Sequence, residues 1–197
     1  MLTPWWEGPS TWDILRDVRA GTSQSSAARQ HMIDLCDAVA RLHESGWVHS
    51  DLQPSHAIHT ADGVRFIDCS WSWHPERLET SLLFRGGLPH LLAPELARSI
   101  HAGERPVAPA KSAEVYALAA SLWWSLTGDW PRDYAHVGIT PAKVTAPVLR
   151  QLIGTRQIPL RGPYSWPGVQ QVLAEVLTAP ADRRLTAAGL AQQLRSL

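Results

Sequence analysis

Lysine, cysteine and long hydrophobic runs are all scarce in this sequence, and each scarcity excludes something. The only lysines are Lys111 and Lys143, and the only cysteines are Cys36 and Cys69. So few cysteines exclude a disulfide framework and are typical of proteins in a reducing compartment. No hydrophobic run reaches the length of a membrane span, and the first residues show no signal-peptide pattern. We therefore expect a cytoplasmic protein without a membrane partner.

Charge of one sign is not in excess either. The 18 basic and 18 acidic residues cancel, which removes the usual electrostatic reason to expect a nucleic-acid partner. Hydrophobic residues make up 45% of the chain, as in globular proteins, and 197 residues predict one domain. The ten tryptophans leave two interpretations open, namely packing of the core and rim or a surface for a partner.

Hydrophobic periodicity predicts a mainly α protein. Residues 1–10 are rich in proline, tryptophan and glycine and predict an extended entry segment, and residues 11–197 predict a helical lobe. Ser10 or Thr11 is a suitable N-cap for the first helix, and Gly46 follows the end of the second. The main helices are expected at residues 11–18, 23–44, 111–127 and 186–195, with the third hydrophobic on all sides and therefore buried.

A single small hairpin interrupts the helical pattern. Two short apolar segments, residues 57–60 and 64–68, flank Asp62 and Gly63, and Asp-Gly between such segments is a strong hairpin signal. Asp51 precedes this hairpin in a loop, and Asp68 ends its second strand. The hairpin would bring the two carboxylates together, where one could accept a proton and the other bind a metal ion.

These residues carry a resemblance to a known family. The segment WVHSDLQPSH at residues 47–56 resembles the protein-kinase catalytic loop, H-R-D-L-K-P-x-N, and Asp68 takes the place of the metal-binding aspartate of D-F-G. Residues 87–95 resemble the family's G-T-P-x-Y-L-A-P-E segment. The buried helix resembles D-V-Y-A-L-G, and residues 180–186 resemble D-P-x-x-R-x-T.

The ordered matches imply the helical C-terminal lobe of a protein-kinase-like fold, a helical bundle whose hairpin carries the catalytic and metal loops. The resemblance makes Asp51 the catalytic base, Asp68 a metal ligand and His49 a packing residue of the loop. It also implies a structural ion pair between Glu95 and either Arg183 or Arg184. Residues 1–10 resemble the hinge that joins the two kinase lobes.

Other family residues are replaced in this sequence. The usual arginine, lysine and asparagine of the loop are Ser50, Gln53 and His56, the threonine that contacts the lysine is Leu88, and the buried-helix aspartate is Glu114. Imidazole is a poor ligand for Mg²⁺ but acceptable for Mn²⁺, so His56 is a weaker candidate metal ligand than Asp68.

The N-terminal lobe features of a kinase are not found in these 197 residues. No glycine-rich phosphate loop occurs, and no lysine precedes Lys111, so the residues that normally hold ATP phosphates are lacking. Because the sequence starts with Met1, we expect a natural boundary here. An open face above the lobe, edged by Trp5, Trp6 and Trp12, would then need a cover.

Two functions from different classes follow from the resemblance. One is a degenerate Ser/Thr kinase-type phosphotransferase that uses ATP with Mg²⁺ or Mn²⁺ and works in a complex, on a peptide in a bacterial biosynthetic pathway in its narrowest form. The alternative is an inactive pseudokinase that serves as a protein-binding or scaffolding module. Both predict a protein partner, or a second copy of the chain, over the open face.

Overall fold

The computed structural model describes residues 5–79, 81–162 and 165–197, and it is mainly helical with one antiparallel hairpin. The helices are α1 (Thr11–Ile14), α2 (Arg16–Arg19), α3 (Ser26–Glu44), α4 (Pro94–His101), α5 (Lys111–Thr127), α6 (Ala146–Gly154), α7 (Pro167–Thr178) and α8 (Ala187–Arg195). The hairpin strands are β1 (Ala57–Thr60) and β2 (Gly63–Phe66). Short 3-10 turns are η1 (Pro54–His56), η2 (Cys69–Trp71), η3 (Pro89–Leu91), η4 (Tyr134–Val137) and η5 (Pro141–Lys143).

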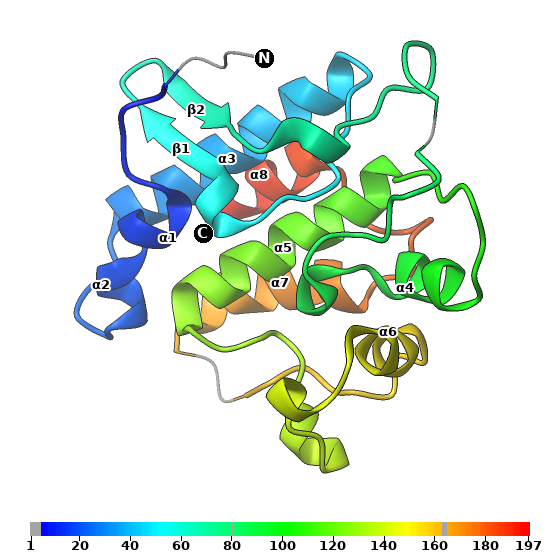
Figure 1. The fold of residues 1–197 in the computed structure, drawn as a ribbon. Coiled ribbons are helices and arrows are strands. Elements are labelled where there is room, and N and C mark those ends of the chain that lie inside the picture. The colour runs from blue at the N-terminus through cyan, green and yellow to red at the C-terminus, as the bar shows by residue number, and fades with distance from the viewer. Residues whose placement is uncertain (1–4, 80, 163–164) are drawn as a thin grey trace.

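Helix α5 runs through the centre of the molecule, as its all-round hydrophobicity predicts. It lies between α3 and α8 on one side and α7 on the other (Figure 1). Tyr116, Leu118 and Trp123 are among its fully buried side chains. Serine at two further positions is buried without cost, because the Ser121 hydroxyl donates to Leu52 O and that of Ser125 to Ser121 O. Helix α5 is thus the support on which the catalytic-loop equivalent rests.

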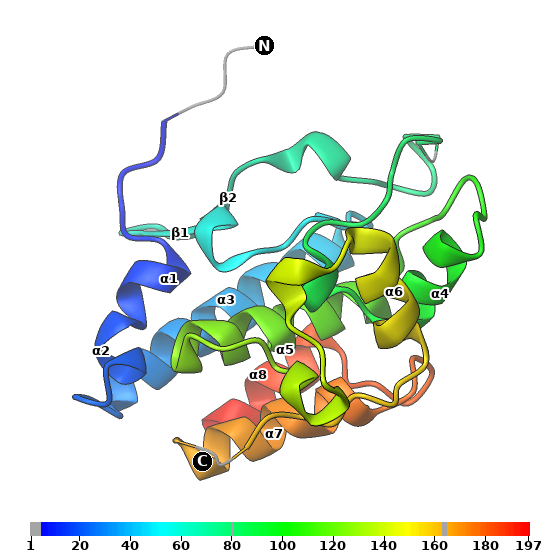
Figure 2. The same cartoon turned by 60° about the horizontal axis from the view of Figure 1, so that its bottom comes forward.

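The hairpin lies above α3, and the entry segment runs beside it (Figures 1 and 2). Ala57 pairs with Phe66 and Thr60 with Gly63, so the turn consists of residues 61–62 alone. His59 N donates to Pro9 O at 2.9 Å, which attaches the entry segment to the free edge of β1. Residues 1–4 of the predicted hinge-like segment lie outside the described residues.

Several predicted boundaries are wrong in detail. The helix expected at residues 11–18 breaks at Leu15 into α1 and α2, although Ser10 caps it in a capping box with Asp13. The long helix begins at Ser26 and not at residue 23, because the Ser25 hydroxyl accepts from Ala28 N and caps it there. Strand β2 ends at Phe66, since Asp68 has a left-handed backbone that no strand accommodates.

Helix α4 was not predicted. Its sequence signal is Pro94 in the first turn, followed by Ala97 and Ile100, which are buried on one face. These side chains join Phe84, Leu149 and Ile153 in a second hydrophobic cluster between α4 and α6, apart from the cluster around α5. None of the helices in the described part of the chain combines the length and hydrophobicity that crossing a bilayer requires.

Candidate active site

The loop that carries Asp51 is held at both of its ends. Val48 pairs with Trp73 through two backbone hydrogen bonds of 2.9 Å, and His49 Nε2 lies 2.9 Å from Ile67 O. Ser50 then adopts a left-handed backbone with φ of 72°, an unusual conformation for a residue other than glycine. The chain therefore turns sharply at Ser50 and presents Asp51 beside the end of the hairpin.

A buried polar network fixes this turn to α5. The Ser50 N–H donates to Glu114 Oε1 at 2.7 Å, and His43 Nε2 lies 2.7 Å from Glu114 Oε2. Glu114 is only 4% exposed, so both of its carboxylate oxygens need these partners. The Lys111 ammonium donates to His43 O and extends the network to α3. The replacement of the family's aspartate by Glu114 thus keeps the buried helix connected to the loop.

The carboxylate of Asp51 is enclosed by its neighbours. Gln53 Nε2 donates to Asp51 Oδ1 at 2.9 Å, and the side chain of Asp51 is only 13% exposed. Gly87 packs directly on it, because a Cβ atom at that position would lie 1.8 Å from Asp51 Oδ1. The resemblance of residues 87–95 to a family segment does not indicate this contact. The glycine at position 87 is the one feature of the sequence that could have predicted it.

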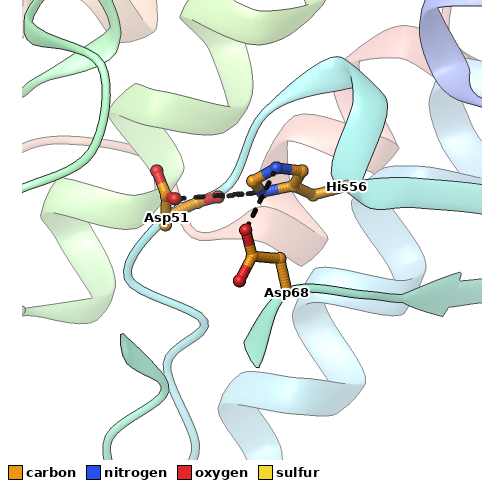
Figure 3. A group of neighbouring side chains, drawn as sticks. All are labelled: Asp51, His56 and Asp68. Atoms are coloured by element: carbon orange, nitrogen blue, oxygen red, sulfur yellow. Dashed lines mark hydrogen bonds and ion pairs between the residues drawn. The ribbon is translucent and has the colours of Figure 1, made fainter. Parts of the chain in front are cut away.

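His56 and Asp68 complete the group of predicted site residues that the structure brings together (Figure 3). His56 belongs to η1, and its Nδ1 atom lies 2.9 Å from Asp51 O. Its Nε2 atom lies 3.7 Å from Asp68 Oδ2. Asp68 reaches this place through its left-handed backbone, with φ of 54°, and its side chain stays 55% exposed. One ligand atom from each of Asp51, His56 and Asp68 lies within 4.8 Å of the others.

The hydrogen bond to His56 indicates which ring nitrogen is free. Because Asp51 O can only accept, Nδ1 of His56 must carry a hydrogen. In a neutral imidazole the lone pair is then on Nε2, which faces the Asp68 carboxylate. The lone pair of Nε2 and the carboxylate oxygens repel each other unless a cation or a proton lies between the two groups. Two carboxylates and an oriented imidazole therefore fit a divalent cation, and they suit Mn²⁺ better than Mg²⁺.

His49 and Cys69 form a second polar contact beneath these residues. Burial is the largest single effect and lowers the pKa of His49, but hydrogen bonding to Cys69 and Ile67 O, together with the charges of Glu114 and Cys69, raises that pKa above its ordinary value. The same His49 contact lowers the pKa of the Cys69 thiol, against the opposing effect of burial. His49 is 1% exposed, which agrees with the packing role that the resemblance implies.

The ion pair expected at Glu95 is made by Arg184 and not by Arg183. Arg184 Nη1 and Nη2 donate to the two oxygens of Glu95 at 2.6 and 3.1 Å, and Arg184 also donates to Ser112 O and Ala179 O. Burial is the largest single effect and raises the pKa of Glu95, but the hydrogen bonds and charge of Arg184, a backbone hydrogen bond and the charge of Arg156 together lower it. This pair joins the start of α4 to the segment before α8.

The three tryptophans assigned to the edge of the open face lie in two different settings. Trp5 is 89% exposed and Trp6 is 37% exposed, with the Arg65 guanidinium 5.2 Å from the Trp6 ring. Trp12 instead packs on Trp124, with ring centroids 4.9 Å apart, and the Arg19 guanidinium lies 3.6 Å above the Trp12 ring. Trp5 and Trp6 are therefore available to a partner, whereas Trp12 is engaged within the lobe.

Comparison with known proteins supports the protein-kinase-like relationship that the sequence motifs imply. The chain is 28% identical over 190 residues to the serine/threonine-protein kinase PkaB of Streptomyces coelicolor, a match of 87% of this chain and 39% of that protein. It is 30% identical over 177 residues to the serine/threonine-protein kinase mos of Sus scrofa, covering 85% of this chain and 46% of that protein. AfsK of Streptomyces griseus is 26% identical over 132 residues, 66% of this chain.

The chain is protein-kinase-like. Its mainly helical architecture with one small hairpin is that of a kinase C-lobe. No family model matches the sequence. The chain spans less than half the length of the curated relatives it matches, so these relatives establish kinship and not the activity of this protein.

Proposed function

We propose that this kinase-like chain is a degenerate phosphotransferase that acts on a Ser or Thr hydroxyl of a peptide or protein. Asp51 accepts the hydroxyl proton, and Asp68 and His56 hold a divalent cation with ATP. The observation that carries the proposal is the convergence of two carboxylates and an oriented imidazole at the end of the hairpin. The narrower assignment to a peptide in a bacterial biosynthetic pathway stays a prediction.

The residues of the loop support this role by position. The network of Glu114 holds the Ser50 turn, which places the Asp51 carboxylate against Gly87. Gln53 donates to Asp51 Oδ1 and leaves Oδ2 to accept a proton. Phosphoryl transfer depends mostly on positioning and charge neutralisation, and the cation would supply the charge neutralisation at the phosphates.

The proposal requires a second contributor. These 197 residues contain no glycine-rich loop and no lysine before Lys111, so the groups that hold the ATP phosphates must come from outside them. Trp5, Trp6 and Ile67 expose 89%, 37% and 37% of their surface near the hairpin, and such apolar side chains favour a protein partner. We therefore propose that the chain is active in a complex that covers this face.

Metal binding is the first test of the proposal. Titration of Mn²⁺ into the protein, followed by calorimetry and by paramagnetic broadening of resonances near His56, should show one saturable site. Asp68→Asn keeps the size of the side chain and removes its charge, so we expect binding to fall by tenfold or more, about 1.4 kcal/mol. Asp62→Asn in the hairpin turn is the matched control and should bind as the unaltered protein does. Binding that is equal in both variants would contradict the assignment of Asp68.

A second candidate function has its own observation. A protonated His56, at 4.0 Å from Asp51 Oδ2 and 3.7 Å from Asp68 Oδ2, would lie between both carboxylates and halve their combined negative charge without any metal ion. A site filled in this way is that of a pseudokinase that acts as a binding module. If Mn²⁺ and ATP together give no saturable signal even with the partner present, this second function replaces the first.

A further inference from the structure

A cavity of about 480 Å³ lies where the end of α3 meets the starts of α5 and α8. Figure 1 shows these three helix ends toward the same side of the lobe. A cavity of this size is large enough to hold a small ligand or the end of a peptide. Its wall contains none of Asp51, His56 and Asp68, so it is a separate place from the candidate active site.

Two helix N-termini with free N–H groups border this cavity. The first turn of α5 has no side-chain cap, so the N–H groups of Lys111 and Ser112 have no acceptor among the described residues. At the start of α8 the Thr186 side chain caps one N–H group, which leaves those of Ala187 and Ala188 without an acceptor in the described part of the chain. Both helix ends carry a partial positive charge, so an anion between them is favoured by the N–H groups and by both macrodipoles.

Two basic side chains in the wall add full positive charges. The ammonium group of Lys111 donates to His43 O and forms no ion pair with any described residue. The side chain of Arg184 is 0% exposed, and its terminal nitrogens bind Glu95 and backbone oxygens, yet its Nε atom has no acceptor within the described ranges. A buried N–H group without an acceptor is rare, because it costs free energy. Since Arg184 lies in the wall of the cavity, a ligand inside the cavity is the acceptor for which the fold leaves room.

The rest of the wall determines which anion fits. Ala40, Val115 and Leu185 are apolar, so they suit a ligand with an apolar body. Glu44 is the one acidic side chain among the described residues of the wall, and it is exposed. Its carboxylate repels a multiply charged anion such as phosphate, but it accepts a hydrogen bond from an N–H group. A single carboxylate joined to an apolar group and to an amide N–H meets all three conditions, and the last residue of a peptide chain has this chemistry.

We propose that this cavity binds the C-terminal carboxylate of a peptide or protein whose last residue is apolar. The carboxylate lies between the first turns of α5 and α8, beside Lys111, and the last side chain occupies the apolar part of the cavity. Capture of a C-terminal carboxylate by backbone N–H groups is an established mode of peptide recognition. The site does not depend on the proposed function, because neither ATP nor a metal ion takes part in it.

The test uses N-acetyl-leucine as the probe and N-acetyl-leucinamide as its uncharged match. In the full chain labelled with ¹⁵N, the backbone amide signals of Ser112, Ala187 and Ala188 should shift and saturate with the acid but not with the amide. Acetyl-Gly-Gly-Leu should bind more tightly than N-acetyl-leucine, because its additional peptide groups extend past Glu44. Signals that move equally with acid and amide, or only linearly with either, would overturn the carboxylate site. Equal affinity for the tripeptide and N-acetyl-leucine would assign the cavity to a small carboxylic acid and overturn the peptide as its occupant.

Ala188→Glu separates loss of binding from loss of folding. A negative charge in the first turn of α8 repels the bound carboxylate, although it suits the helix N-terminus. We expect N-acetyl-leucine to bind about fivefold more weakly, the size expected for one charge at a helix end, with a melting temperature no lower than that of the unaltered protein. Ala188→Gln has the same size without the charge and should bind as the unaltered protein does. Equal weakening in both variants would mean that side-chain size blocks the cavity, and it would contradict a carboxylate at the helix N-termini.

The scarcity of lysine supplies a second matched pair. Lys111→Gln removes the positive charge from the wall and should weaken N-acetyl-leucine binding by about two- to fivefold, as for an exposed ion pair. Lys143→Gln removes the same charge from η5, which does not border the cavity, and should leave the affinity unchanged. Equal affinities of the two lysine variants would show that Lys111 does not contact the carboxylate, and they would contradict its place in the proposed site.

Discussion

At the scale of single residues, the proposed metal site makes His56 the residue that would decide which cation is preferred. Its Nδ1 hydrogen is committed to Asp51 O, so Nε2 faces Asp68 as a nitrogen ligand. Nitrogen ligands suit Mn²⁺, whereas Mg²⁺ requires oxygen ligands in a strict octahedron. The asparagine that the kinase family has at this place would offer an oxygen instead. The family's residue and the residue of this chain therefore predict different metal preferences.

We expect His56→Asn to shift the preference of the site from Mn²⁺ toward Mg²⁺. The ratio of the two dissociation constants, measured by calorimetry, should change by about tenfold, the size expected for one good ligand interaction. His31→Asn on α3 is a control that leaves the site intact. An unchanged ratio would show that His56 is not a ligand and would favour the second candidate function, in which a protonated His56 lies between the carboxylates.

At the scale of elements, the segment that leads into α4 acts as a cover on the Asp51 loop. Gly87 is the point of contact, and a side chain there has no room because Asp51 Oδ1 would lie 1.8 Å from its Cβ. The second hydrophobic cluster holds Phe84 and Leu92 on either side of this contact. The loop and the segment therefore cannot separate locally without disturbing α4 and α6.

Gly87→Ala tests this packing. The added methyl group must displace either the Asp51 carboxylate or the segment, and overpacking of this kind costs about 1–3 kcal/mol. Gly162→Ala is the matched control, since a Cβ atom at Gly162 meets nothing within 4 Å. Urea unfolding should show the loss of stability in Gly87→Ala alone. Equal stability of the two variants would mean that the segment moves away from Asp51 readily.

At the scale of the whole molecule, two histidines with lowered pKa values contribute to the loss of stability in acid. Burial lowers the pKa of His59 to about 4, and burial lowers the pKa of His90 to about 4 as well. His59 lies 3.0 Å from Thr11 Oγ1 near the hairpin, and His90 stacks on Trp130 at 4.0 Å near η4. Protonation is thus opposed in two separate parts of the lobe.

The sign of the pH dependence follows from these depressed values. The unfolded chain binds protons on both histidines below its ordinary histidine pKa of about 6.5, whereas the folded chain resists until about pH 4. The stability that these two histidines contribute is therefore fully present above about pH 6.5 and is lost as the pH drops toward 4. His90→Phe keeps a ring against Trp130 and removes one titrating group, so its melting temperature should fall less steeply. His136→Phe, on an exposed histidine, should leave the slope unchanged.

The sequence was sufficient for the elements with a strong local signal. The buried helix at Lys111–Thr127 and the first strand at Ala57–Thr60 have the predicted bounds, because an unbroken apolar stretch and an Asp-Gly turn determine them locally. Helix α4 escaped prediction because its short apolar face follows a long irregular stretch. The end of β2 was misplaced because the left-handed backbone of Asp68 depends on its tertiary contacts.

The candidate site likewise has a part that the sequence predicted and a part that only the tertiary structure shows. The order and spacing of Asp51, His56 and Asp68 predicted the candidate site, because the family motif is a local pattern in the chain. The contact of Gly87 with Asp51 and the hydrogen bonds of Glu114 to His43 and Ser50 join residues far apart in sequence. Such contacts depend on how helices and loops pack, and no local pattern encodes that packing. The sequence by itself determined which chemistry is present, and the tertiary structure decided which groups face one another.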